Sequence, residues 1–234
     1  MMKPSLETVL SDPRIWRGAD LAPVAVATSS GFDVLDRELP GGGWPAAGII
    51  ELQYEAFGQG EMRLLLPSLA AISRQAGKIV LIGPPYLPYA PAWAAAGVDL
   101  RQMLWLHIDA ERERLWAFEQ SLRSGACQVV LLWLAHRPEQ RNWRRLQLAA
   151  EAGGCAGWVL LPDKSSVHSS PTPLRLQFGR DRSDRAPLVR IRKRRGVPLQ
   201  RPISMAVLDQ PFQRNRAACA IDSQPASPHP PNKE

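Results

Sequence analysis

Apolar runs and amphipathic segments alternate along most of this chain. The strand candidates are residues 48–52, 78–83, 101–108, 127–135 and 157–162. The helix candidates are a segment with its apolar face at Met62, Leu65, Leu66, Leu69 and Ile72, and residues 92–98, 111–125 and 138–153. The run 127–135 is continuously apolar from Val129 on, as expected of a strand covered on both faces in a parallel sheet. The alternation predicts a doubly wound, mostly parallel α/β sheet with right-handed crossovers.

The pattern changes after Pro162, where a polar segment rich in Ser and Pro begins. Apolar and basic residues then alternate, with the apolar positions at Leu174, Leu176, Phe178, Leu188, Val189 and Ile191. A Gly/Asp/Ser turn separates the two halves, which predicts an antiparallel hairpin at the sheet edge. We therefore expect an N-terminal lead-in at 1–24, a core domain at 25–197, and a Pro- and Arg-rich flexible tail at 198–234.

Composition adds one asymmetry. With 234 residues, 45% of them hydrophobic, the chain can bury one substantial core. The net charge is +7, but residues 1–170 hold 16 Lys and Arg against 17 Asp and Glu, whereas residues 171–234 hold 13 against 5. This difference favours a polyanion or an acidic protein surface as partner of the basic part. No segment reads as a signal peptide or membrane span, so we expect a cytoplasmic protein without membrane contact.

Cysteine and histidine are too scattered to suggest a metal site. The three cysteines, Cys127, Cys155 and Cys219, form no CxxC pair, and His107, His136 and His168 lie far apart in the sequence. The spacing therefore predicts neither a disulfide framework nor a bound metal, and a reducing compartment fits the chain.

The segment GGGWPAAGIIELQYEAFGQGEMRLLLPSLA has the layout of a phosphate-binding loop. A working loop reads GxxxxGK[ST], because backbone N–H groups wrap the phosphates, a Lys reaches the terminal phosphates and a hydroxyl holds magnesium. Residues 53–62 contain no Lys, Ser or Thr, and Glu55 and Glu61 would repel a triphosphate. Gly58 and Gly60 could still offer backbone N–H groups to a phosphate, or could serve only as turn glycines with positive φ.

Residues 27–195 resemble the RecA recombinase family in the order of their motifs. The resemblance is carried by ATSSGFDVLDRELPGGGWPAAGIIEL, KIVLIGPPYLPYAPAWAAAGVDLRQMLWL and SGACQVVLLWLAH. Where that family has its ATP-loop Lys and Thr, its catalytic glutamate and its magnesium-linked aspartate, this chain has about Gly60 and Glu61, Pro85 and Trp133. The resemblance implies a RecA-like fold without the ATPase. We expect a non-enzymatic protein with no catalytic residue, cofactor or metal.

Within the RecA/SulA-like superfamily the chain resembles the ImuA subgroup, through GEMRLLLPSLA and WLAHRPEQRNWRRLQLAAEAGGCAGWVLLP. That resemblance implies an accessory role in SOS-induced translesion DNA synthesis. The implied partners are an ImuB-like polymerase homologue, an error-prone replicative-type polymerase subunit and RecA, with a cytoplasmic location near the nucleoid after DNA damage. The same segments also resemble the SulA family. This alternative implies an inhibitor of the tubulin-like division protein that caps its polymerisation surface.

Two basic segments are candidates for contact with DNA or a protein partner. The first is RIRKRRG, with Arg190, Arg192, Lys193, Arg194 and Arg195, which fits DNA phosphates, an acidic protein or a solvated sheet edge. The second is a helix with Arg141, Trp143, Arg144 and Arg145, which fits either a partner-binding clamp or a solvated face. We expect Trp105, Trp133 and Trp158, in or beside apolar strands, to pack in the core.

Overall fold

The computed structural model describes residues 27–163, 171–199 and 201–209 of the chain. The lead-in expected at 1–24, the segment 164–170 and residues 210–234 of the expected tail lie outside the described residues. Within the part described, no helix is both long enough and apolar enough to cross a membrane.

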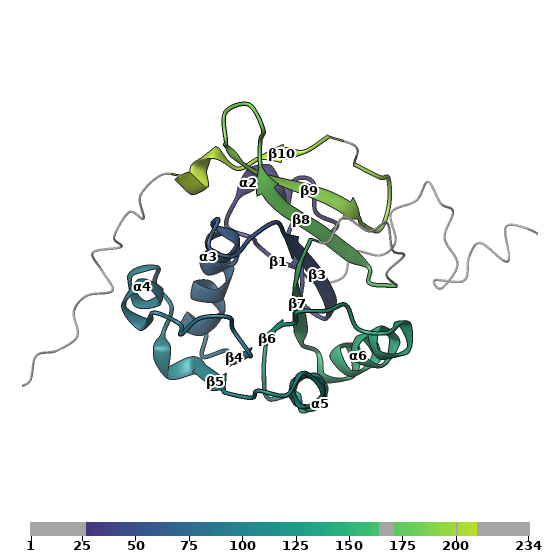
Figure 1. Cartoon of the computed structure of the whole chain (residues 1–234). Helices are drawn as coiled ribbons and strands as arrows, with labels where there is room; N and C mark the ends of the chain where they lie inside the picture. Colours follow the sequence, from purple (N-terminus) through teal and green to yellow (C-terminus); the bar gives the residue numbers. More distant parts are fainter. Residues whose placement is uncertain (1–26, 164–170, 200, 210–234) are drawn as a thin grey trace, which may run out of the picture.

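An eight-stranded sheet forms the centre of the molecule, with strand order β10-β9-β8-β3-β7-β6-β4-β5. The strands are β3 (Gly48–Tyr54), β4 (Ile79–Ile82), β5 (Met103–Leu106), β6 (Val129–Trp133), β7 (Ala156–Pro162), β8 (Leu174–Arg180), β9 (Pro187–Lys193) and β10 (Ile203–Ser204). Strands β5, β4, β6, β7, β3 and β8 run parallel to one another, while β9 is antiparallel to β8 and β10 is antiparallel to β9. The predicted mostly parallel α/β fold with an antiparallel edge is confirmed (Figure 1).

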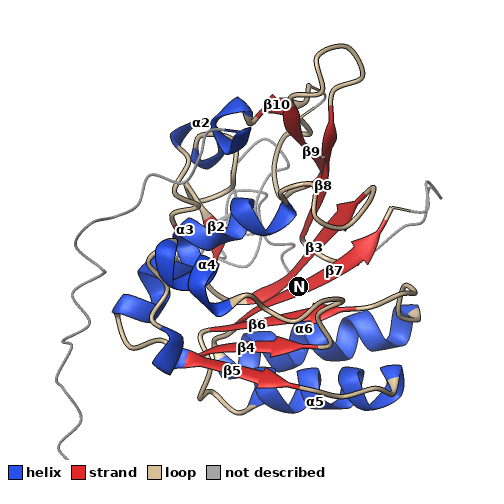
Figure 2. Ribbon diagram, turned by 60° about the vertical axis from the view of Figure 1, so that its left-hand side comes forward, coloured by secondary structure: helices blue, strands red, loops and turns tan. Residues whose placement is uncertain are grey.

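Helices cover both faces of the sheet, which makes the fold doubly wound (Figure 2). One core holds apolar side chains of α3 (Glu61–Arg74) and Trp93 of α4 (Ala90–Ala95). The other holds those of α5 (Glu111–Arg123) and α6 (Gln140–Gly153). The apolar periodicity of the segments explains these faces, since residues three or four apart lie on one side of a helix.

A small unit precedes the sheet. It comprises β1 (Ala27–Thr28) paired with β2 (Trp44–Pro45), and between them the single-turn helix α2 (Asp33–Asp36), whose Leu35 is fully buried. The edge of Trp44 meets the ring face of Trp158 on β7, with ring centroids 4.9 Å apart, so this unit packs on the sheet through aromatic contact.

The two ends of the sheet differ from expectation. Strand β5 is an edge strand and leaves Trp105 41% exposed, so the expectation that this residue packs in the core is wrong, whereas Trp133 and Trp158 are buried. At the other end the sheet continues past residue 198, because β10 pairs with β9 and the short helix η2 (Ala206–Asp209) follows it with Leu208 buried. Part of the segment assigned to a flexible tail therefore belongs to the core.

Candidate functional site

The three positions at which the ATPase residues are replaced meet around one hollow. Glu61, Pro85 and Trp133 follow or end β3, β4 and β6, and all three line a cavity of about 350 Å³ at the carboxyl ends of these strands. This is the place where open α/β sheets bind their ligands. Most of the lining residues are apolar or aromatic, and the charged residues among them are Glu61 and Arg63.

The phosphate loop is occupied by a side chain of the protein itself. The carboxylate of Glu61 accepts hydrogen bonds from the backbone N–H groups of Gly58 at 3.0 Å and Gly60 at 3.1 Å. Gly58 and Gly60 both adopt positive φ, +76° and +110°, a conformation that glycine reaches without steric cost. Glu61 is 5% exposed and opens α3, where the helix dipole favours a negative charge. The loop is thus an anion-binding turn that is already filled.

The filled turn also affects Tyr54, at the end of β3. Burial and the nearby charge of Glu61 raise the pKa of this phenol well above its usual range. Tyr54 therefore stays neutral, and its ring packs against Phe57 with centroids 4.7 Å apart. Phe57 in turn meets Tyr86 edge-on at 6.1 Å. This aromatic row connects the core to the surface of the hollow.

An exposed apolar surface lies at the mouth of the hollow. It consists of Phe57, Tyr86, Leu87 and Tyr89, which are 39%, 72%, 73% and 69% exposed. We call these four residues the apolar surface. Large apolar side chains grouped on a surface mark sites of protein interaction.

The sequence analysis did not identify the apolar surface, although the sequence contains a signal for it. Residues 84–91 read PPYLPYAP, and four prolines exclude both strand and helix interior from this stretch. Large apolar residues in a loop after a buried strand have no core to enter. Their exposure follows from that arrangement.

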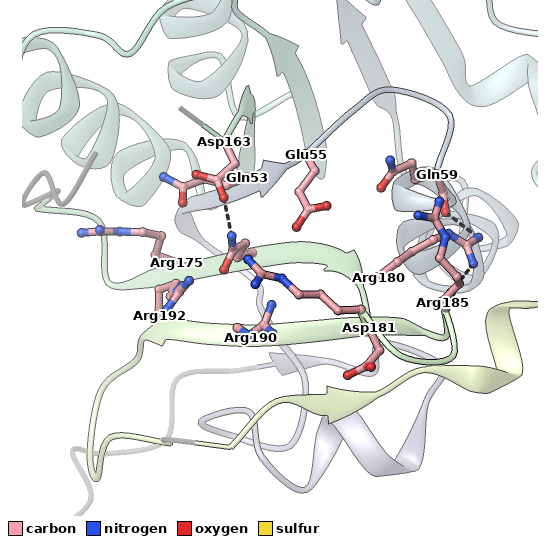
Figure 3. Close-up of a pocket in the computed structure, with 12 residues that line it drawn as sticks. Gln53, Glu55, Gln59, Asp163, Arg175, Arg180, Asp181, Arg185, Arg190 and Arg192 are labelled. Carbon is pink, nitrogen blue, oxygen red and sulfur yellow. Dashed lines mark hydrogen bonds between the residues drawn. The ribbon is translucent and has the colours of Figure 1, made fainter. Parts of the chain in front are cut away.

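A second feature, a basic groove, lies at the β8–β9 end of the sheet (Figure 3). Its volume is about 1140 Å³. Six arginines line it: Arg175, Arg180, Arg182, Arg185, Arg190 and Arg192. Three carboxylates, those of Glu55, Asp163 and Asp181, line it as well. We call this feature the arginine groove; it collects residues from β3, β8, β9 and the loops that follow them.

The basic segment 190–195 is divided between two places. Arg190 and Arg192 line the arginine groove, and Lys193 and Arg195 are exposed. Arg194 has a structural role: its Nη1 atom donates to the backbone oxygen of Glu38, and its Nε atom donates to Val197 O at 2.6 Å. The five cations therefore do not form one binding surface.

The basic helix does not present Trp143 to a partner, as the clamp alternative requires. Trp143 is 2% exposed and packs in the core beneath α6, so its ring cannot stack on a partner. Arg145 pairs with Glu119 of α5, and Arg141 pairs with Glu139 at 2.7 Å, while Arg144 is exposed. The spacing of Trp143, Leu146 and Ala150 on one helix face signals this burial.

A buried ion cluster supports the floor of the arginine groove. Glu51 on β3 is fully buried and pairs with Arg137 at 2.6 Å and with Arg175 Nε at 3.7 Å. Gln53 Nε2 and Thr172 Oγ1 donate to the same carboxylate at 2.8 and 3.4 Å. Burial lowers the pKa of Arg175, and Glu51 opposes that shift. Glu51 is therefore a structural counter-ion.

The described residues contain no group of three His, Cys, Asp or Glu that could hold a metal ion. Cys155 is buried, and its burial raises the pKa of the thiol to about 12, which keeps the group unreactive at neutral pH. Cys219 lies outside the described residues.

Known proteins resemble the central part of this chain. The sequence model of a family described as "Cell division inhibitor SulA" matches residues 48–157. The cell division inhibitor SulA of Pectobacterium carotovorum subsp. carotovorum is 31% identical over 121 residues, which are 51% of this chain and 72% of that protein. SulA of Edwardsiella piscicida is 31% identical over 132 residues, 55% of this chain and 77% of that protein. The crystal structure of SulA from Pseudomonas aeruginosa shares 22% identity with a TM-score of 0.42, covering 48% of this chain and 97% of that one.

These matches correct the expectation of a translesion-synthesis accessory protein. The relatives are named cell division inhibitors, and the family model spans the residues of the hollow, the loop and the apolar surface. The same finding overturns the expected partners, which were an ImuB-like polymerase homologue, an error-prone polymerase subunit and RecA. At this level of identity and coverage, the chain belongs to the SulA cell division inhibitor family.

Proposed function

We propose that this protein inhibits cell division by binding the tubulin-like division protein and capping its polymerisation surface. The observation that carries the proposal is the apolar surface, which stands at the ligand-binding edge of a nucleotide-binding fold whose own phosphate loop is filled by Glu61. The action is stoichiometric binding in the cytoplasm and not a reaction. Membership in the SulA family supports the choice of partner.

The geometry suits a protein partner. Tyr86, Leu87 and Tyr89 project from the stretch 84–91, whose four prolines restrict the backbone, so little backbone freedom is lost on binding. Tyrosine offers a large, rigid contact area and a polar hydroxyl, which is the composition of interface hot spots. The hollow behind these residues can receive an apolar side chain of the partner.

The proposal is tested with the full chain and the purified tubulin-like division protein, by following polymerisation with light scattering. We expect stoichiometric protein to suppress assembly. Leu87→Ala removes one exposed side chain, and we expect it to weaken inhibition by roughly tenfold, because loss of a central apolar contact costs about 1–2 kcal/mol.

Leu148→Ala is the matched control, because Leu148 is 59% exposed but lies on α6, away from the hollow. This variant should inhibit like the parent protein. An equal loss of inhibition in Leu87→Ala and Leu148→Ala, or no inhibition by the parent protein, would contradict the proposal. The same pair of variants can be compared in cells, where only the parent and Leu148→Ala should cause filamentous growth.

The narrower resemblance to the ImuA subgroup remains a prediction from the sequence. It depends on the upstream helix and on residues beyond 162, and the family match ends at residue 157. The proposed function does not depend on it.

A further inference from the structure

We infer that the arginine groove binds an extended acidic peptide segment of a protein partner. The groove is separate from the apolar surface, since no described residue lines both this groove and the hollow behind that surface. The inference therefore goes beyond the proposed function and does not depend on it.

The floor of the groove is a sheet face that no described helix covers. Helix α6 covers β3 near its start, where Gln147 Oε1 accepts from Ile49 N at 2.9 Å, but α5 and α6 do not extend over β8 and β9 (Figure 2). On this face Gln53 of β3, Gln177 of β8 and Arg190 of β9 follow one another across the sheet, because register pairs Gln53 with Gln177 and Gln177 with Arg190. The opposite side chains of β8 and β9 are in the core.

Several of the groove arginines are available to a ligand. Arg182, Arg190 and Arg192 make no ion pair with another described residue, whereas Arg180 is held by Gln59 O and Asp209 at 3.2 Å each. Figure 3 shows Arg190 and Arg192 both reaching into the groove from β9. Arg192 and Arg137 also disfavour the charged form of Arg175, so an incoming anion relieves repulsion that the fold already carries.

The groove offers acceptors as well as cations. The amide oxygen of Gln177 is buried and has no hydrogen-bond partner within the described part of the chain, and Gln177 is only 7% exposed. The amide oxygen of Gln59 is likewise unpartnered there. The carboxylate of Glu55 forms neither an ion pair nor a hydrogen bond with another described residue. A ligand for this groove should therefore carry donors together with negative charge.

An extended acidic peptide meets both requirements. Its carboxylates pair with guanidinium groups in bidentate geometry, and its backbone N–H groups can donate to the amide and carboxylate oxygens. Alternate side chains of an extended chain repeat about every 6.7 Å, the same spacing as Arg190 and Arg192 two residues apart on a strand. The phosphate groups of a nucleic acid offer acceptors only, and no aromatic side chain lines the groove to stack a base.

The test measures fluorescence anisotropy of a short labelled peptide of alternating glutamate and serine, titrated with the full chain. A peptide with glutamine in place of glutamate and a single-stranded oligonucleotide of equal charge are measured in parallel. We expect the acidic peptide to bind with an affinity that falls as salt rises, and the other two probes to bind at least about tenfold more weakly.

The double variant Arg190→Gln with Arg192→Gln should weaken peptide binding by roughly tenfold or more, since two charge-assisted contacts are lost. Arg112→Gln with Arg144→Gln is the matched control, because both residues are exposed on α5 and α6 and the change in net charge is the same. If the double variant does not fold, the single variant Arg192→Gln is measured in its place, because Arg192 is exposed. It should also weaken peptide binding relative to the parent protein.

Three outcomes would overturn the inference: no binding of the acidic peptide, equal loss in the groove and control variants, or tighter binding of the oligonucleotide. The last outcome would assign the groove to nucleic acid. Leu87→Ala should leave peptide binding unchanged, so a failure of the groove and a failure of the apolar surface are distinguishable.

Discussion

At the residue scale, Glu61 shows how one substitution converts a binding loop into a closed turn. A lysine at this end of the loop would leave the N–H groups of Gly58 and Gly60 open to a phosphate. The glutamate instead accepts from both of them and is nearly buried. The negative charge that a nucleotide would bring is already supplied by the fold, at the amino end of α3 where it is stabilised.

Replacing Glu61 by alanine should therefore destabilise the protein. The N–H groups of Gly58 and Gly60 would lose a charged acceptor, and we expect the free energy of unfolding to fall by about 1–3 kcal/mol. Urea unfolding measures the change. Glu61→Gln, which retains one acceptor oxygen, should lose less than Glu61→Ala, and equal stability of all three proteins would show that the two hydrogen bonds contribute nothing.

The residues also show what sequence reasoning could reach. The sequence predicts that the ATPase site is lost. Lys and Thr are absent from the loop and Pro85 and Trp133 replace two carboxylates, and that chemistry has strict residue requirements. The hydrogen bonds from the loop to Glu61 could not be predicted from the sequence, because a sequence gives the charge of a residue but not the direction of its side chain. Arg194 was misjudged for the same reason, as the run 190–195 does not reveal that one of its members faces Glu38.

At the element scale, the connection between β9 and β10 is held to the N-terminal unit by ion pairs. Glu38, just after α2, pairs with Arg194 at 3.4 Å and with Arg201 at 3.1 Å. The Arg194 side chain is only 16% exposed, so its charge is poorly solvated without this partner. The two arginines join segments that are more than 150 residues apart in the sequence.

Arg194→Gln should thus lower the free energy of unfolding by about 1–3 kcal/mol, because it breaks a partly buried pair and a bond to a backbone oxygen. The neighbouring change Arg195→Gln provides the control, since Arg195 is exposed. Its effect should stay within about 0.5 kcal/mol. Thermal or urea denaturation of the two variants checks both values, and similar destabilisation by the two changes would rule out a special role for Arg194.

Elements were more predictable than their edges. Helices and strands from β3 to β9 appear in the predicted order, because a continuous apolar run and a 3.6-residue period are strong local signals. The sheet edges were harder. Leu104 and Trp105 are apolar but exposed on β5, and β10 has only two residues, so its pairing with β9 depends on long-range packing that no local pattern encodes.

At the scale of the whole molecule, a mostly parallel α/β sheet carries two surface features at different places. The carboxyl ends of β3, β4 and β6 surround an apolar hollow, and the β8–β9 end of the sheet carries the arginine groove. Family resemblance read from the sequence identified the superfamily, but the function that it favoured, a role in translesion synthesis, is corrected in favour of the SulA alternative. The family match spans residues 48–157, which form the central part of the core.

We expect the whole protein to be indifferent to ATP. A ligand present at 100 times its Kd would stabilise the folded state by about 2.7 kcal/mol, which a thermal melt detects readily. The melting temperature should be the same with and without millimolar ATP and magnesium, and calorimetry should record no heat of binding. An upward shift with ATP would show that the loop can exchange the Glu61 carboxylate for a phosphate.

The Glu61 turn has a consequence for regulation in the cell. The activity of a recombinase-type ATPase depends on the ATP level, because its conformation changes with the nucleotide that it binds. A protein that keeps a carboxylate of its own in that position has no such input, and its recognition surface is ready as soon as the chain has folded. If the protein inhibits by stoichiometric binding, as proposed, its effect should scale with its concentration and not with the level of ATP.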